Sequence, residues 1–200
     1  MSSVQIKEIR PVRMSFYIRG TSPLIQHAWS EKGLAMMRMT AQERKKQPKT
    51  ARDPEKEARE AMYQTADGQP GIPLLAFKAS LIGAAHKDLG LEKTLVKKAF
   101  FVPSNDPNNI TPIEADEPVV REDIVRVGAN QTDLRYRPQF NNWRANIVAE
   151  IDSELLSAQD VANLVNRAGF SVGIGEWRPE KGGEFGRFEL DTSVPMQEVK

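Results

Sequence analysis

The sequence predicts an α+β protein built on one antiparallel or mixed sheet. Three observations support this class. A strand pattern opens the chain at 12–20, apolar-striped helices are expected at 73–86 and 157–169, and the strand patterns between those helices follow one another without a helix. With 200 residues and 40% hydrophobic content, the chain can form one domain with a real core, which we expect to cover 1–200.

The N-terminal elements follow from alternation and capping. Residues 12–20 alternate apolar and polar side chains and stop at Gly20, as a half-buried strand does. A helix is expected from about Ser30 to Met39. Ser30 can act as its N-cap, although Gly33 stands where a full capping box needs Glu or Gln.

The remaining elements follow from apolar stripes and turn residues. Pro73 can begin a helix, Ser157 can cap another, and Gly169 is expected to end that second helix. The resulting order predicts a ferredoxin-like (RRM-like) β-α-β-β-α-β core with insertions and a C-terminal glycine-rich loop. The expected elements are a helix at 73–86 with an apolar stripe of Leu74, Phe77, Leu81 and Ala85, strands at 99–102, 119–127 and 145–151, a helix at 157–169 with Val161, Leu164 and Val165 on one face, and a terminal strand.

The glycine-rich stretch at 173–190 is the most informative local feature. It holds five glycines, and Arg178, Lys181 and Arg187 supply positive charge. Glycine lets backbone approach a ligand closely and these cations suit a phosphodiester chain, so the loop is predicted to hold a polyanion. The alternative is an ordinary hairpin whose phenylalanines belong to the core. The stretch lacks the third glycine of a dinucleotide fingerprint and follows a helix instead of opening one.

A basic, exposed insertion is expected at about 38–66. From Arg38 to Arg59 the chain holds eight Lys or Arg against four Asp or Glu, with few apolar residues. With Pro48 and Pro54 interrupting it, the segment should be mobile until an anion orders it; the alternative is a solvated linker. The whole chain has a formal net charge of only +1, so binding to nucleic acid must come from local clustering of charge.

Composition excludes several kinds of chemistry. The chain has no cysteine, which removes disulfides and thiolate metal sites. No His-Glu-x-x-His pattern is present, and Glu122 and Asp123 would face opposite sides of a strand, so we expect no metal and no cofactor. We find no signal-like apolar run at the N-terminus and no segment of membrane-spanning length, and therefore expect a soluble, cytoplasmic protein.

Three segments resemble the RAMP superfamily, whose members bind or process guide RNA in CRISPR systems. They are the first strand running into Gly20-Thr21-Ser22-Pro23-Leu24, the Ile72-Pro73 step leading into 77–81, and the loop from Gly173 through Phe188. The chain is also similar to small proteins encoded by bacteriophages and prophages, which would place it in the cytosol of a bacterial host. The resemblance implies a ferredoxin-like fold and contact with single-stranded RNA or DNA, as a homo-oligomer or filament and with no membrane.

We therefore expect a single-stranded nucleic-acid binding protein, largely independent of sequence, that assembles along RNA or DNA. A basic groove would follow the phosphates while aromatic side chains stack on bases. The segment 135–144 interleaves arginines with aromatic residues; its alternative is a strand pair with Tyr136 and Trp143 in the core. The candidate binding residues are Arg44, Lys45, Lys46, Lys49, Arg52, Lys78, Arg135, Arg137, Arg144, Gly173, Gly175, Trp177, Arg178, Lys181 and Arg187.

Two other functions stay open. Some RAMP proteins cleave RNA with a histidine shortly after the first strand, so the resemblance makes His27 a candidate acid or base of a metal-independent endoribonuclease. A lone histidine is more often structural. The other function is a protein-interaction module that caps or mimics a host RAMP assembly. Salt separates the classes, since binding through phosphates weakens steeply as salt rises.

Overall fold

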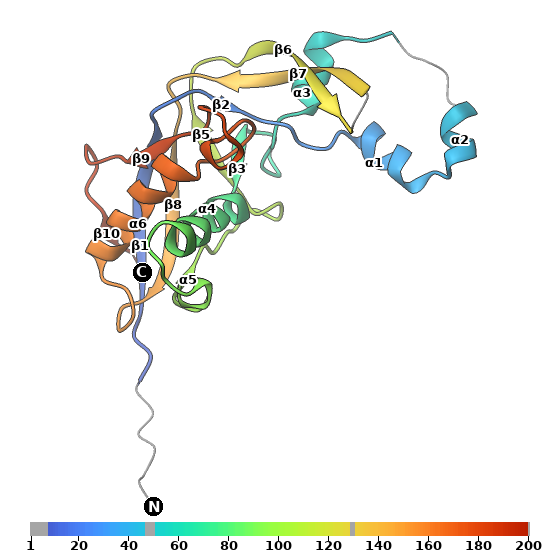
Figure 1. Cartoon of the computed structure of the whole chain (residues 1–200). Coiled ribbons are helices and arrows are strands. Elements are labelled where there is room, and N and C mark those ends of the chain that lie inside the picture. Colours follow the sequence, from blue (N-terminus) through green and yellow to red (C-terminus); the bar gives the residue numbers. More distant parts are fainter. Residues whose placement is uncertain (1–7, 47–50, 129–130, 200) are drawn as a thin grey trace, which may run out of the picture.

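The computed structural model describes residues 8–46, 51–128 and 131–199, and it is α+β with antiparallel sheets (Figure 1). The larger sheet is built around β1 (Pro11–Gly20) and β8 (Arg144–Asp152), which pair along almost their whole length. Its other members are β9 (Phe188–Leu190) and β10 (Gln197–Glu198) beside β1, β4 (Phe100–Phe101) and β5 (Ile110–Glu114) beside β8, and β3 (Gly71–Pro73) beyond β5.

One face of this sheet forms the core. Helices α4 (Leu74–Lys87) and α6 (Ala158–Ser171) pack on it, and the apolar stripes predicted for both helices are buried. The ring centroid of Phe77 in α4 lies 6.4 Å from that of Phe16 and 5.8 Å from that of Phe188. Burying one such side chain contributes about 1.5–3 kcal/mol, so Phe77 helps to hold α4 against β1 and β9, which pair directly with each other.

Capping residues set the starts of two helices, as predicted. Ser30 accepts a hydrogen bond from the Gly33 N–H and caps α1 (Glu31–Arg38). Ser157 and Asp160 form a reciprocal capping box at the start of α6. Across the described ranges, none of the helices combines the length and apolar character of a membrane span.

Gly169 does not end α6, contrary to the prediction. The helix continues to Ser171, after which the chain forms a short 3-10 helix, η1 (Pro179–Lys181), before β9. A Cβ at Gly169 would lie 1.7 Å from the carbonyl oxygen of Phe188. The glycine therefore lets β9 cross the helix closely. A further helix, α5 (Lys93–Ala99), packs beside α4 in the same layer.

A smaller sheet holds the hairpin of β6 (Val119–Val127) and β7 (Gln131–Phe140), with β2 (Leu24–Ile25) paired to β7. Figure 1 shows this hairpin at the top, with α3 (Pro54–Glu60) near it. Helices α1 and α2 (Ala41–Lys46) form an arm that projects from the body, with α1 nearer the hairpin and α2 at the far end. Strand β7 contains most of the arginine- and aromatic-rich segment, so the strand-pair interpretation of that segment is correct.

The aromatic residues of this segment divide between core and surface. Phe140 and Trp143 are each 1% exposed, and Trp143 Nε1 donates to the carbonyl oxygen of Ser22 at 2.9 Å. Tyr136 is half-buried on the hairpin. The prediction of a core role is therefore right for Trp143 and wrong for Tyr136.

The expected insertion at 38–66 is not exposed throughout. Asp53 caps α3 by accepting from the Lys56 N–H, and Pro54 takes the first helical position, where its missing N–H leaves no bond unmade. Ala58 is 1% exposed and lies where the helix packs against the hairpin. Pro54 therefore starts a helix instead of interrupting the segment.

Candidate nucleic-acid interface

The three segments singled out in the sequence meet at one place. The Gly186 N–H donates to Pro23 O at 2.8 Å and the Glu176 N–H to Ile25 O at 2.9 Å, which fastens the glycine-rich loop to the chain leaving β1. The Ile72-Pro73 step lies against the same loop. Together they enclose a pocket of about 140 Å³ whose walls include Leu24, Ile72, Pro73, Gly175 and Arg178.

The glycines of the loop make room for the chain itself. Gly175 and Gly186 have φ values of 77° and 64°, in the left-handed region. A Cβ would lie 2.5 Å from Ile25 O at Gly175, and 1.7 Å from Ile174 O at Gly186. At Gly173 it would lie 2.8 Å from the Pro179 ring. Internal packing therefore accounts for these glycines, in place of the close approach of a ligand that the sequence suggested.

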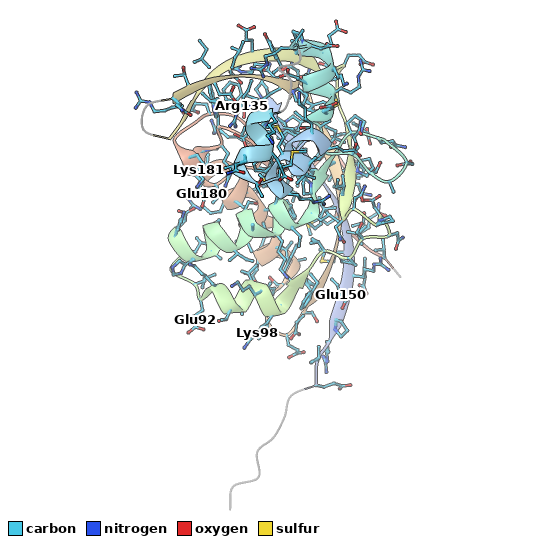
Figure 2. All side chains as sticks on the ribbon, turned by 90° about the vertical axis from the view of Figure 1, so that its right-hand side faces the viewer. Glu92, Lys98, Arg135, Glu150, Glu180 and Lys181 are labelled. Carbon is cyan, nitrogen blue, oxygen red and sulfur yellow. The ribbon has the colours of Figure 1, made fainter. Side chains whose placement is uncertain are left out.

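Two cations of the loop differ in how freely they face solvent. Arg178 Nη2 lies 2.8 Å from Glu180 Oε2, and Arg178 Nη1 donates to Gly175 O at 3.0 Å. Lys181, by contrast, is exposed at the end of η1. Figure 2 shows Lys181 and Glu180 below Arg135, which belongs to β7 of the hairpin. Arg178 thus holds the loop together, whereas Lys181 is available at its surface.

Arg137 is buried and cannot contact a polymer, although the sequence placed it among the binding residues. Its side chain is 2% exposed, with Nη1 3.4 Å from Asp123 Oδ2 and Nη2 3.5 Å from Glu176 Oε2. Position 137 falls on the inward side of β7, where a charge requires partners because burial removes its hydration. This arginine joins the hairpin to the glycine-rich loop.

Arg121 forms a second link between hairpin and loop. Its guanidinium lies 5.2 Å from the ring centroid of Trp177 and 4.8 Å from that of Phe185. Trp177 has a φ of 52° and is 38% exposed. A cation between two aromatic faces is attracted to both rings, so Trp177 is already partly used within the chain.

A groove of about 410 Å³ lies between α3, the chain entering α1, and β7. Trp29 stands in its wall and is 63% exposed. Arg52 lies over the Tyr136 ring, 5.3 Å from its centroid. Cations and carboxylates among the lining residues are equal in number: Lys32, Arg52, Lys56 and Arg135 against Asp53, Glu57, Glu60 and Asp133.

The ion pairs of the groove are open to solvent. Arg52 Nε donates to Glu57 Oε1 at 3.0 Å, and its Nη1 lies 3.7 Å from Asp133 Oδ1. Arg135 Nε lies 3.4 Å from Asp133 Oδ2. The side chain of Arg52 is 42% exposed and that of Asp133 49%. Exposed pairs of this kind contribute only about 0–1 kcal/mol, so a ligand can replace them at little cost.

His27 lines both pockets and is held in one tautomer. Its Nε2 lies 3.2 Å from Arg135 Nη1. Because a guanidinium can only donate, Nε2 accepts this bond and the ring proton sits on Nδ1, which is enclosed and has no partner among the described residues. Burial, and then the charges of Arg135 and Arg137, lower the pKa of His27. Its accepting nitrogen is therefore engaged, which opposes the acid–base role considered from the sequence.

Arg144 lies outside the groove, on the face of the larger sheet opposite the helices. Its guanidinium is 5.2 Å from the centroid of the Tyr17 ring, and its Nη2 is 2.6 Å from Glu114 Oε2. This group resembles that of Arg52, Tyr136 and Glu57, but no lining residue of the groove belongs to it. It therefore offers a matched comparison for experiments.

Two more predicted cations also lie away from the groove. Lys78 Nζ lies 4.4 Å from the centroid of the Phe101 ring and donates to Lys97 O at 3.3 Å. Arg187 lies 5.0 Å from the centroid of the Phe170 ring. The structure thus disperses residues that the sequence grouped by charge alone.

The basic residues of the arm are only partly described. Lys46 is exposed on α2. Arg44 and Lys45 belong to the same helix, but their side chains fall outside the description, as does the whole of Lys49. Since the chain from Trp29 leads directly from the groove into α1, the described helix α2 that carries Lys46 belongs to the arm that leaves the groove.

Sequence reasoning missed Trp29, Lys56 and the acidic side chains that share the groove. Trp29 stands alone between His27 and the helix cap, where no periodic pattern says whether an aromatic residue is buried. The available signal was its position directly before the N-cap Ser30, where a hydrophobic residue often packs on the helix that follows. In the structure, however, Trp29 is largely exposed.

No family model and no curated protein matches the chain. Among solved structures, it superimposes on a chain of one described as a cryo-EM structure of the Type III-B Cmr-beta bound to cognate target RNA. The TM-score is 0.49 at 10% sequence identity, over 95% of this chain and 61% of that one. The protein thus spans about three fifths of that chain's length.

Proposed function

We propose that the protein binds single-stranded nucleic acid, with bases stacked in the groove beside Trp29 and phosphates held by the cations around it. The observation that carries this proposal is the 63% exposure of Trp29 in the wall of a 410 Å³ groove that also holds Arg52 and Arg135. Burial of a tryptophan side chain is strongly favourable in free energy, and a base stacked on Trp29 would bury its exposed ring.

The surface extends from the groove onto the arm. Lys46 and the neighbouring basic residues Arg44, Lys45 and Lys49 would follow the phosphate chain, since the arm begins at the groove wall. Lys181 on the glycine-rich loop is a further exposed cation. The polymer's phosphates would compete with Glu57 and Asp133 for the cations of the groove.

The fold assignment proposed with this function is a ferredoxin-like core of the RAMP type, in one unit of residues 1–200. The strand order β9–β1–β8–β4 supports it, because α4 lies between β1 and β4 in the chain and α6 between β8 and β9. The insertion at about 38–66 then carries α2 and α3.

We also propose that the protein assembles along the polymer, because the helix that begins the arm is exposed. Helix α1 has no buried residue, and Leu34 and Met37 on it are 40% and 52% exposed. An eight-residue helix is marginal in water without packing, so its apolar side requires a partner. The same observation favours a second candidate function, a protein-interaction module that docks through this arm.

The test is fluorescence anisotropy with labelled single-stranded RNA and DNA of equal length, at low and high salt. We expect Trp29→Ala to weaken binding about tenfold, since stacking one base contributes about 1–3 kcal/mol. Arg52→Glu should weaken it further. A gel of the recovered RNA should show intact polymer.

Arg144→Glu is the matched control, because Arg52 and Arg144 have equal side-chain exposure of 42% and both lie near a tyrosine ring. It should bind as the unchanged chain does. Equal loss in the two charge reversals would refute the groove as the site. No binding to either polymer would refute the function and leave the protein-interaction module.

A further inference from the structure

The carboxylates of the groove need a role that phosphate binding does not give them. Asp53, Glu57, Glu60 and Asp133 match the cations of the groove in number. On a surface built only for phosphates, each carboxylate would repel the polymer. Asp53 caps α3, Glu57 is paired to Arg52, and Glu60 lies 3.9 Å from Lys56 Nζ. Asp133 is 49% exposed on β7, and its pairs with Arg52 and Arg135 are open to solvent and therefore weak.

We infer that the groove selects one unpaired guanine, stacked on Trp29 and recognised by Arg135 and Asp133. This inference rests on the proposed function. Arg135 Nε and Asp133 Oδ2 are 3.4 Å apart, so a donor and an acceptor stand side by side two residues apart on one strand. Guanine carries acceptors at O6 and N7 and adjoining donors at N1 and N2, so it can use both groups at once.

The other bases fit this pair less well. A carboxylate has two oxygens and can accept two parallel hydrogen bonds, which the N1–H and N2–H of guanine supply. Adenine and cytosine present an amino group without an adjoining ring N–H, and uracil presents a single N–H. Each would leave one carboxylate oxygen or one guanidinium N–H without its bond, and such unmade bonds weaken binding.

The groove has the size and the walls for one base. Its volume of about 410 Å³ lies within the range of about 300–1,000 Å³ usual for small-ligand sites. Trp29 offers an exposed stacking face, and the Arg52 guanidinium over Tyr136 provides a flat neighbouring wall. The exposed pair of Arg135 and Asp133 can open toward a ligand because it is only weakly stabilising.

The experiment compares labelled oligouridines of one length that carry a single central guanine, inosine, adenine, cytosine or no substitution. Anisotropy at one salt concentration gives their dissociation constants. We expect guanine to bind about tenfold more tightly than the others, as one bidentate contact allows. Inosine lacks the 2-amino group and should lose most of that preference. Asp133→Asn should bring the guanine-to-inosine ratio close to one.

Glu114→Gln is the matched variant, because Glu114 is an exposed carboxylate paired to Arg144 outside the groove. It should keep the full preference for guanine. Equal binding of all five oligonucleotides would overturn the guanine site and leave the proposed function standing. A preference for another base, or a guanine preference that survives in Asp133→Asn, would also overturn it. If no oligonucleotide binds, the proposed function itself fails.

Discussion

Arg137 Nη2 lies 3.5 Å from Glu176 Oε2, so a buried cation in the middle of β7 holds the glycine-rich loop against the hairpin. The same guanidinium lies 3.4 Å from Asp123, whose residue is 4% exposed. Neither carboxylate is adjacent to Arg137 in the chain: Asp123 lies on β6 and Glu176 on the glycine-rich loop. Arg137 is therefore a buried link between hairpin and loop, in addition to Arg121 and the backbone hydrogen bonds of Glu176 and Gly186.

Replacing Arg137 should destabilise the fold strongly. Arg137→Leu leaves Asp123 buried beside fewer positive charges, and breaking a buried pair costs about 3–5 kcal/mol. Urea denaturation measures the free energy of unfolding. Arg144→Leu removes an exposed pair and should cost about 1 kcal/mol or less. Similar losses in the two variants would show that the buried link is not what holds the loop.

Two left-handed glycines of the loop should respond differently to alanine. Gly186 and Gly182 have φ values of 64° and 78°, so both substitutions carry a backbone cost of roughly 1–2 kcal/mol. A Cβ at Gly186 would also lie 1.7 Å from Ile174 O, whereas nothing lies within 4 Å at Gly182. We expect Gly186→Ala to lower the midpoint of thermal unfolding far more than Gly182→Ala. Equal midpoints would mean that the loop can shift freely.

Acidification should destabilise the protein through His27. Its pKa is lowered from the ordinary value of 6.5 by burial and by the charges of Arg135 and Arg137, so the unfolded chain binds a proton there more readily than the folded one. The stabilisation is complete above about pH 6.5 and is lost as the pH falls toward the lowered value. In His27→Gln the unfolding midpoint should fall less between pH 8 and pH 5. Parallel curves for the two proteins would contradict this.

Binding to single-stranded polymer should weaken as salt rises. Each phosphate contact contributes about 0.7 to the slope of log K against log salt, and four cations line the groove. The groove alone should therefore give a slope of about −3 at most, contacts on the arm should make the slope steeper, and Arg52→Glu should make it shallower. Anisotropy titrations at several salt concentrations measure it. A much steeper slope would place the main contacts on the basic arm instead of the groove.

Local signals were sufficient for the principal helices and for the central strands. Ser30 and Ser157 cap the helices that they were expected to cap, and the apolar stripe beginning at Leu74 is buried as expected. These features depend on residues three or four positions apart, which a helix brings together by its own geometry. The prediction that Gly169 ends the helix was wrong, because this glycine is required where a distant strand, β9, crosses the helix.

Charge was a poor guide to the candidate site. The sequence grouped Arg135, Arg137 and Arg144, yet the structure places the first in the groove, buries the second and turns the third to another face. Arg135 and Arg137 are two positions apart, so alternation places them on the same face of β7 and does not separate them. Arg137 is buried because Asp123 of β6 and Glu176 of the loop lie against it. Pro54 was also misjudged, because a proline that interrupts one pattern can begin the next helix.

Short-range periodicity and capping encode the α+β class, the sites where helices begin and the apolar faces that build the core, so these features could be predicted from the chain alone. The exposure of Trp29, the contact of Arg135 with His27 and the equal number of carboxylates and cations in the groove depend on tertiary packing. Those contacts join β7 to the chain before α1 and to α3, more than a hundred positions apart in the case of Arg135 and His27. Such pairings are fixed by how the hairpin packs, and no local pattern in the chain carries that information.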